Sequence, residues 1–212
     1  MNYKVENGSV MILGSNPKST GDLIIPDKID GFPVTSIGIY AFYECTDLTS
    51  VTLPSSVSYI GDGAFYGCSG LTSVTLPSSL TSIGQETFSG CTGLTSVTLP
   101  SSITSIGNFA FIECTGLKSV TIPNSITSIG NYAFSGCSGL TNVTIPNSVT
   151  EIGNYAFEGC SGLTSITIPN SITSIGDYAF LGCIKLTAKN ISADAKSVIE
   201  VLSQVCYRSV RG

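Results

Sequence analysis

Apolar and polar positions recur along most of this chain with a fixed step of 23 residues. Within one step, Leu71, Val74 and Leu76 form an L-x-x-L-x-L pattern, and the last two alternate with Ser73 and Thr75. Alternation with period two is typical of a half-buried β-strand. A proline follows directly and removes a backbone donor, so the pattern predicts a strand that ends there.

The second half of each step predicts a shorter extended segment and a turn. Leu80 and Ile83 indicate the extended segment, which a glycine closes. The seven residues that follow are too few for a regular helix, so we expect one helical or 3₁₀ turn. Phe88 and Cys91 are three residues apart and would then face the same way, into the core.

The same landmarks return at every step. Six regular units run from Leu48 to Lys185, and a seventh, Thr20 to Asp47, has five extra residues between Pro26 and Gly38. The aligned columns are Pro54, Pro77, Pro100, Pro123, Pro146 and Pro169; Phe65, Phe88, Phe111, Phe134, Phe157 and Phe180; and Cys45, Cys68, Cys91, Cys114, Cys137, Cys160 and Cys183. Each coil exposes an apolar edge that only the next coil can cover. The pattern therefore predicts a solenoid of about seven coils with parallel strands.

Both ends depart from the repeat. Tyr3 to Leu13 alternates around Asn7-Gly8, a type I′ turn signal, which predicts a hairpin that covers the first coil. Leu186 to Ser192 begins an eighth strand, but Lys189 takes the position of the core valine. Ser192 is then a suitable N-cap for a helix from Ala193 to about Cys206. We expect a capping hairpin over 1–19, the solenoid over 20–192, and a capping helix and tail over 193–212, within one structural domain.

Composition and charge exclude several classes of protein. Charged residues make up 11% of the chain, against roughly 25% in soluble domains, and the net charge is −5. Nucleic-acid binders need clustered Lys and Arg, which this chain lacks. No apolar run reaches the length of a membrane span, and the start of the chain has no pattern of a secretory signal.

The cysteine column suggests thiols in the core. Stacking places the cysteines about 4.8 Å apart with parallel Cβ vectors, whereas a disulfide needs Cβ atoms about 3.5–4.5 Å apart that face each other. Metal sites favour C-x-x-C pairs or mixed Cys and His spacing, and the chain has no histidine. We interpret the column as buried free thiols that fill a small core position, and we expect no metal and no cofactor.

The carboxylates do not suggest an active site. Without histidine the usual base at neutral pH is missing. Glu44, Glu86, Glu113, Glu151 and Glu158 occupy variable positions of different coils. Solvated surface charges explain them, so we expect that the protein is not an enzyme.

Two outer columns are candidates for recognition. Threonines line the outer face of the long strands: Thr52, Thr75, Thr98, Thr121, Thr144 and Thr167. Aromatic residues precede each A-F pair: Tyr40, Phe109, Tyr132, Tyr155 and Tyr178, interrupted by Gly63 and Glu86. Such a stripe can anchor a partner or form a stacked ladder over the coil edges. The candidate partner-binding residues are Thr75, Thr98, Thr121, Thr144, Lys118, Tyr132, Tyr155 and Tyr178.

The repeat resembles a known family. The stretch I-D-G-F-P-V-T-S-I-G (Ile29–Gly38), the A-F-Y-E-C that follows and the recurring V-T-I-P-N-S-I-T-S-I-G-N-Y-A-F are similar to the BspA-type leucine-rich repeats. The resemblance covers Thr20 to about Thr187. It implies a right-handed leucine-rich-repeat solenoid, a place on the surface of bacteria or protozoan parasites, and adhesion to host matrix or cell-surface proteins. The family has no shared catalytic residues and no fixed ligand motif.

Three functions follow as hypotheses. The first is a monomeric, non-enzymatic surface or secreted protein that binds a protein partner through the strand face or the aromatic flank. The second is a structural spacer of a longer surface protein, which near-identical coils favour. The third is an ice- or glycan-binding lattice of hydroxyl groups on the strand face.

Overall fold

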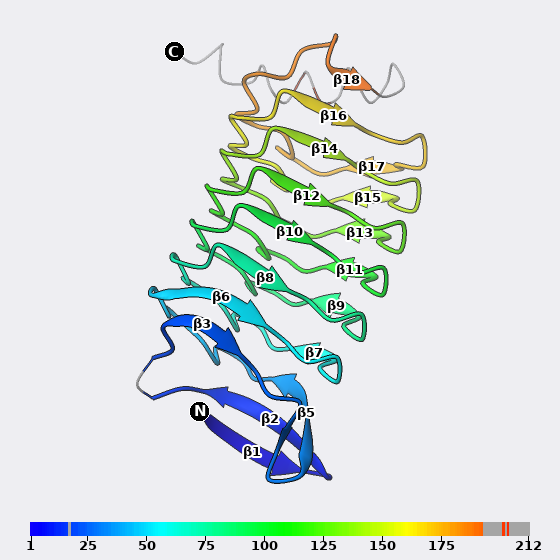
Figure 1. The fold of residues 1–212 in the computed structure, drawn as a ribbon. Coiled ribbons are helices and arrows are strands. Elements are labelled where there is room, and N and C mark those ends of the chain that lie inside the picture. Colours follow the sequence, from blue (N-terminus) through cyan, green and yellow to red (C-terminus); the bar gives the residue numbers. More distant parts are fainter. Residues whose placement is uncertain (17, 193–200, 202, 204–212) are drawn as a thin grey trace.

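The chain folds into a solenoid with two columns of strands, shown in Figure 1. The computed structural model describes residues 1–16, 18–192, 201 and 203. The long-strand column contains β3 Gly21–Ile24, β6 Leu48–Thr52, β8 Ser73–Thr75, β10 Ser96–Thr98, β12 Ser119–Thr121, β14 Asn142–Thr144, β16 Ser165–Thr167 and β18 Ile191–Ser192. The short-strand column contains β5 Phe32–Ile37, β7 Tyr59–Ile60, β9 Ser82–Ile83, β11 Ser105–Ile106, β13 Ser128–Ile129, β15 Glu151–Ile152 and β17 Ser174–Ile175. Each coil therefore contributes one strand to each column, as the repeat predicts.

Both columns pair in parallel, and the pairs between β6 and β16 and between β5 and β17 keep the 23-residue register. Val97 lies opposite Val120 in the long-strand column, and Ile106 lies opposite Ile129 in the short-strand column. The long strands form three ladders, β3-β6-β8, β10-β12 and β14-β16-β18, while β9 to β17 form one. Because each partner is the same position of the next coil, apolar side chains stay on the inner face along the whole stack.

The third side of each coil is a run of turns, and the predicted helical turn is wrong. Backbone N–H groups alternate there between two kinds of acceptor: Ala133 donates to Gly130 within the coil (3.3 Å), and Phe134 donates to Ala156 in the next coil (2.8 Å). Two columns adopt left-handed φ values between 50° and 77°: Tyr40, Gly63, Glu86, Phe109, Tyr132, Tyr155 and Tyr178; and Glu44, Gly67, Gly90, Glu113, Gly136, Gly159 and Gly182. A left-handed residue at every fourth position interrupts a right-handed helix.

A ladder of phenylalanine rings forms the centre of the core. The seven rings are fully buried and stack with centroids 5.3–5.5 Å apart: Phe42, Phe65, Phe88, Phe111, Phe134, Phe157 and Phe180. Leu71, Leu80 and Ile83 are also buried, as expected, whereas Val74 and Leu76 are only partly buried. Burial of large apolar side chains is the main favourable term in folding, and here every coil repeats it.

The cysteine column lies beside the phenylalanines, and its burial is confirmed. Cys45, Cys68, Cys91, Cys114, Cys137, Cys160 and Cys183 are buried free thiols. From Cys68 onward each Sγ–H donates to the carbonyl of a core phenylalanine in the preceding coil, at 3.0–3.2 Å. Burial raises the pKa of Cys68 and of Cys114 to about 12. These thiols therefore stay protonated and unreactive at neutral pH.

Side-chain amides also connect successive coils. The Oδ1 atoms of Asn108, Asn131 and Asn154 each accept the backbone N–H of the residue 23 positions later, at 2.8 Å. The backbones approach closely beside this ladder, since a Cβ atom at Gly130 would lie 2.7 Å from the carbonyl carbon of Gly107. Glycine at this column is required for coils to pack at this spacing.

Two hairpins close the N-terminal end. The predicted hairpin is confirmed: β1 Asn2–Glu6 pairs with β2 Ser9–Gly14 through Asn7-Gly8, with φ values of 52° and 75°. β2 then pairs in parallel with β5 of the first coil. The five extra residues of that coil form a second hairpin, in which β4 Lys28–Ile29 pairs with β5 across Asp30-Gly31. The hydroxyl of Tyr3 donates to Asp30 and joins the two hairpins (2.5 Å).

The C-terminal end differs from the prediction in its register. The eighth strand, β18, contains only Ile191 and Ser192, and Ile191 lies opposite Ile166. The step is thus 25 residues, and Ile191 rather than Lys189 takes the buried position. The expected helix over 193–206 falls almost entirely outside the described residues and stays a prediction, as do the domain boundaries.

Candidate functional site

The exposed face of the long strands is polar and regular. Thr75, Thr98, Thr121 and Thr144 all point to solvent there, as predicted from their alternation with core residues. Thr98 pairs with Thr121 and Thr144 with Thr167, so the hydroxyl groups repeat along the stack axis. No side-chain hydrogen bond between neighbouring threonines of this column is seen in the described residues, which leaves the hydroxyls available to water or to a ligand.

The predicted threonines of the strand face lie in two separate hollows. The larger, about 590 Å³, lies over β12, β14 and β16. Thr121, Thr144 and Thr167 line it together with Asn124 and Asn147. The smaller, about 340 Å³, includes Thr75 and Thr98. The structure therefore brings Thr121 and Thr144 together and leaves Thr75 and Thr98 in another hollow.

Asn124 and Asn147 are lining residues that the sequence reasoning missed. Each follows a proline directly at the end of a long strand, as P-N-S, whereas the earlier coils read P-S-S. This change in one column was a usable signal, because an amide offers both donors and an acceptor where serine offers a hydroxyl. We call the larger hollow, with its hydroxyl and amide lining, the strand-face groove.

Lys118 lies outside the lining of the groove. It takes the place of a threonine in a column whose hydroxyls donate to the backbone of the preceding coil, as Thr164 does to Thr141 (2.9 Å). The Lys118 side chain is exposed, and its carbonyl accepts the Thr141 hydroxyl (3.3 Å). Lys118 thus adds a positive charge beside β12 without taking part in the column's hydroxyl bonds.

The aromatic column forms a stacked ladder on the turn side of the coils. Phe109, Tyr132, Tyr155 and Tyr178 are half-buried, with ring centroids 4.9, 4.6 and 5.2 Å apart. Burial raises the pKa of Tyr155, and the neighbouring Tyr132 adds to that effect. The ladder covers coil edges, which is one of the two roles weighed for it. Its tyrosines lie on turns, so they are not part of the strand-face groove.

A second aromatic group lies at the N-terminal coils. Tyr40 and Tyr43 are exposed, their rings meet edge to face at 5.7 Å, and Tyr43 stacks on Tyr66 at 5.3 Å. Together with Glu86 these tyrosines line a hollow of about 550 Å³. We call it the tyrosine pocket. From the sequence, Tyr40 was predicted to belong to the aromatic column, and Glu86 to interrupt that column as a solvated surface charge. The contribution of Tyr43 and Tyr66 from the neighbouring column was missed.

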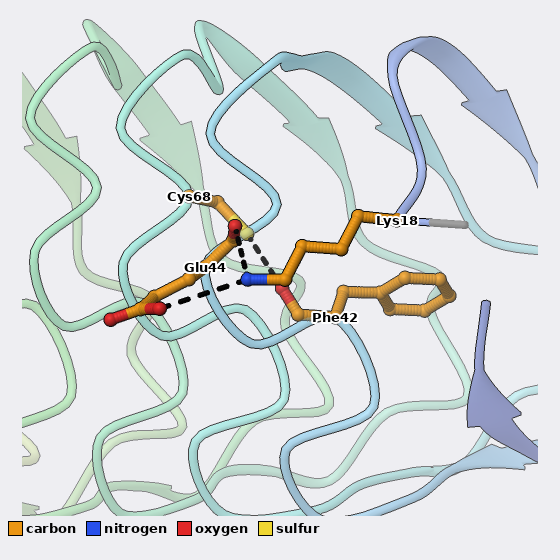
Figure 2. A network of polar contacts seen from close by, with 4 residues as sticks. All are labelled: Lys18, Phe42, Glu44 and Cys68. Carbon is orange, nitrogen blue, oxygen red and sulfur yellow. Dashed lines mark hydrogen bonds and ion pairs between the residues drawn. The ribbon is translucent and has the colours of Figure 1, made fainter. Parts of the chain in front are cut away.

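Lys18 follows the N-terminal hairpin and contacts Glu44 of the first coil, as Figure 2 shows. Its Nζ donates to the carbonyl of Glu44 (2.9 Å), lies 3.7 Å from Oε2 of the same residue, and is 5.7 Å from the centroid of the Tyr43 ring. The same view shows Cys68 donating to the carbonyl of Phe42 beneath the surface. Charged, aromatic and core contacts therefore meet at the first coil.

The described residues contain neither a group of metal-ligand side chains nor a long apolar helix. No group of three or more His, Cys, Asp or Glu side chains among them is placed to hold a metal ion. In the same part of the chain, no helix has the length and apolar character needed to cross a bilayer.

Two columns of parallel strands, a 23-residue step and a buried Leu-Phe-Cys core define a leucine-rich-repeat solenoid. Within that class, the family model described as "BspA type Leucine rich repeat region" matches residues 20–141 and 104–208. The chain belongs to this family, and leucine-rich-repeat modules of this kind are generally non-enzymatic interaction modules.

Solved structures agree with this assignment. A leucine-rich repeat protein of T. pallidum is 32% identical, with a TM-score of 0.84 over 94% of this chain and 92% of that one. A leucine-rich repeat protein of Bacteroides ovatus is 31% identical (TM-score 0.64; 85% and 55% covered), and a leucine rich cell surface protein of Faecalibacterium prausnitzii is 27% identical (TM-score 0.59; 89% and 64% covered). This chain thus spans nearly all of the first protein but under two thirds of the other two. No curated protein matches the chain.

Proposed function

We propose that this protein is a non-enzymatic, monomeric binding module of the bacterial cell surface that holds a protein partner in the strand-face groove. The observation that carries the proposal is the groove itself, in which exposed hydroxyl and amide groups from three successive long strands converge around about 590 Å³. The membership in a family of interaction repeats supports the class of function. The relative named as a cell surface protein supports the location.

The groove favours a polar, extended segment of a partner. Its lining combines hydroxyls and amides with the apolar edges of Ile122, Ile145 and Pro146. Hydroxyls and amides can exchange hydrogen bonds with a peptide backbone, and the rigid sheet beneath lowers the entropy lost on binding. A uniform spacer would not need the asparagines that distinguish the later coils from the earlier ones.

A binding assay with matched variants tests the proposal. The protein is passed over immobilised extracellular matrix proteins, and over a glycan array as a separate arm. Thr144→Arg places a long charged side chain in the groove, so we expect binding to a matrix protein to weaken by about tenfold or more. Ser174→Arg puts the same side chain on the exposed short-strand face and should leave binding unchanged.

Three results would count against the proposal. Binding to no matrix protein would favour the spacer, and binding to glycans alone would favour the hydroxyl lattice. Equal binding by Thr144→Arg and the unaltered chain would show that the groove is not the contact surface.

A further inference from the structure

The tyrosine pocket has a shape that depends on a missing side chain. Tyr40, Gly63 and Glu86 occupy the same position in three successive coils. A Cβ atom at Gly63 would lie 2.1 Å from the Tyr40 ring, so the ring leans into the space that a side chain would fill. From there the Tyr40 hydroxyl donates to Oε2 of Glu86 (3.3 Å). The absence of a side chain at Gly63 is therefore what joins the first aromatic ring to a carboxylate two coils away.

Among the described residues, Tyr66 has a stacked ring neighbour in one direction only. Tyr66 stacks on Tyr43 on the side of the preceding coil. On the side of the following coil the same column holds Ser89, which is small and buried. The Tyr66 side chain also lines the pocket, together with Tyr40, Tyr43 and Glu86.

The surroundings of the pocket are negative. Glu86 is oriented by the Tyr40 hydroxyl and by Nε2 of Gln85, which donates to Oε1 (3.1 Å). The charge of Glu86 raises the pKa of Tyr40, and Asp62 adds to that effect. Lys18 pairs with Glu44, and within the part of the chain that the structure describes no cation contacts Glu86.

The protein itself already places a cation on these rings. The Lys18 ammonium lies 5.7 Å from the centroid of Tyr43, within the range of a cation–π contact. Tyr66 and Glu86 offer the same combination of ring and carboxylate on the pocket side. A planar cation suits that side best, because guanidinium can stack on a ring and bond a carboxylate with its forked donors at the same time.

From this geometry we propose that the tyrosine pocket binds the guanidinium group of an arginine side chain from a partner protein. The guanidinium stacks on the Tyr66 ring within the pocket, with the Tyr40 ring beside it, and donates to the Glu86 carboxylate. This site is separate from the strand-face groove, and it does not depend on what the groove binds.

Titration with short peptides tests the proposal directly. The probes are acetyl-Gly-Arg-Gly-amide and its citrulline and lysine counterparts, followed by amide NMR shifts of the ¹⁵N-labelled full chain at low salt. We expect saturable shifts around Tyr66 and Glu86 with the arginine peptide. The citrulline peptide has nearly the same shape without the charge, and it should bind at least about tenfold more weakly.

Three variants separate the site from general charge effects. Glu86→Gln removes the carboxylate charge and Tyr66→Leu removes the ring, and each should weaken arginine binding about tenfold. Glu151→Gln removes the same charge from the short-strand face and should leave binding unchanged. Melting curves check that each variant is folded. If Tyr66→Leu does not fold, the test uses Glu86→Gln alone.

The proposal is overturned by any of three outcomes. These are equal binding of the citrulline peptide, equal binding of the lysine peptide, or unchanged arginine binding by Glu86→Gln.

Discussion

At the scale of single residues, the core and the strand face of one coil should respond very differently to the loss of a side chain. Phe134 is fully buried between two other rings, and Thr121 is exposed on β12. We expect Phe134→Ala to lower the free energy of unfolding by about 3–5 kcal/mol through lost burial and the cavity left behind. Thr121→Ala should lower it by less than about 0.5 kcal/mol. Urea titrations of both variants measure the difference, and equal losses would mean that the two columns are misassigned.

Replacing glutamate by glycine should stabilise the fold in a left-handed column and destabilise it in a strand. Glu113 has φ of 58° at a position where five other coils have glycine. Because a left-handed conformation costs a side chain about 1–2 kcal/mol, Glu113→Gly should raise the free energy of unfolding by roughly 0.5–1 kcal/mol. Glu151→Gly, in strand β15, should lower it by a similar amount. Thermal and urea unfolding compare the two, and destabilisation by Glu113→Gly would contradict the strain.

Which residues are buried and which are exposed was largely predictable from the sequence, because burial follows the repeat. The phenylalanine, cysteine and leucine columns all lie inside, and the threonines outside, since one periodic pattern specifies all of them. The tyrosine pocket was not predictable in the same way. It depends on Tyr40 leaning over Gly63 and on Tyr66 in a neighbouring column, and a side chain's direction across coils is not visible in a linear pattern.

At the scale of elements, the column of buried thiols should make the free energy of unfolding fall as the pH rises above about 9. Burial raises the pKa of Cys68 and Cys114 to about 12 from an ordinary value of 9.0, and the pKa of Cys91 and Cys137 rises well above it. Below about pH 8 both the folded and the unfolded chain keep these protons. Between pH 9 and 12 the unfolded chain loses protons that Cys68 and Cys114 retain in the folded chain, so each of these two thiols lowers the free energy of unfolding by about 1.4 kcal/mol per pH unit.

Urea titrations at pH 7, 8, 9 and 10 check this dependence. We expect a flat profile up to about pH 8 and a steep loss above pH 9. A variant with Cys91, Cys114 and Cys137 all changed to Ala serves as the control, because its slope above pH 9 should be shallower whatever its absolute stability. A slope identical to that of the unaltered chain would assign the loss to other groups.

Strands, hairpins and turns were predicted correctly only where residues close together in the sequence indicate them. The hairpin at Asn7-Gly8 was predicted because both turn residues favour positive φ. The second hairpin at Asp30-Gly31 has a comparable signal that was overlooked within the five extra residues. The turn segments were mistaken for helical turns because their hydrogen bonds alternate between two coils, which no property of a single coil reveals. The shift of β18 by two residues likewise depends on packing against β16.

At the scale of the whole molecule, coils should be interchangeable units. Deleting the 23 residues 118–140 joins Leu117 to Thr141 in the register of the repeat, so the flanking coils can stack directly. We expect a folded, cooperative protein whose urea m-value is smaller by roughly one eighth, in proportion to the lost surface. Circular dichroism and urea unfolding measure this. Deleting residues 118–129 instead breaks the register and should unfold the chain, and equal behaviour of the two deletions would argue against independent coils.

The strand-face groove and the tyrosine pocket differ in charge, so ligand binding at the two sites should depend differently on ionic strength. Between residues 48 and 184, Lys118 is the only basic residue, and the strand-face groove is lined by uncharged side chains. Contacts between neutral groups are not screened by added salt. The attraction between an exposed carboxylate and a guanidinium weakens as added salt shortens the Debye length below its value of about 8 Å at physiological ionic strength. Binding in the groove should therefore persist at about 0.5 M sodium chloride, while binding at Glu86 should weaken. A salt series on one complex would show which of the two surfaces a natural partner uses.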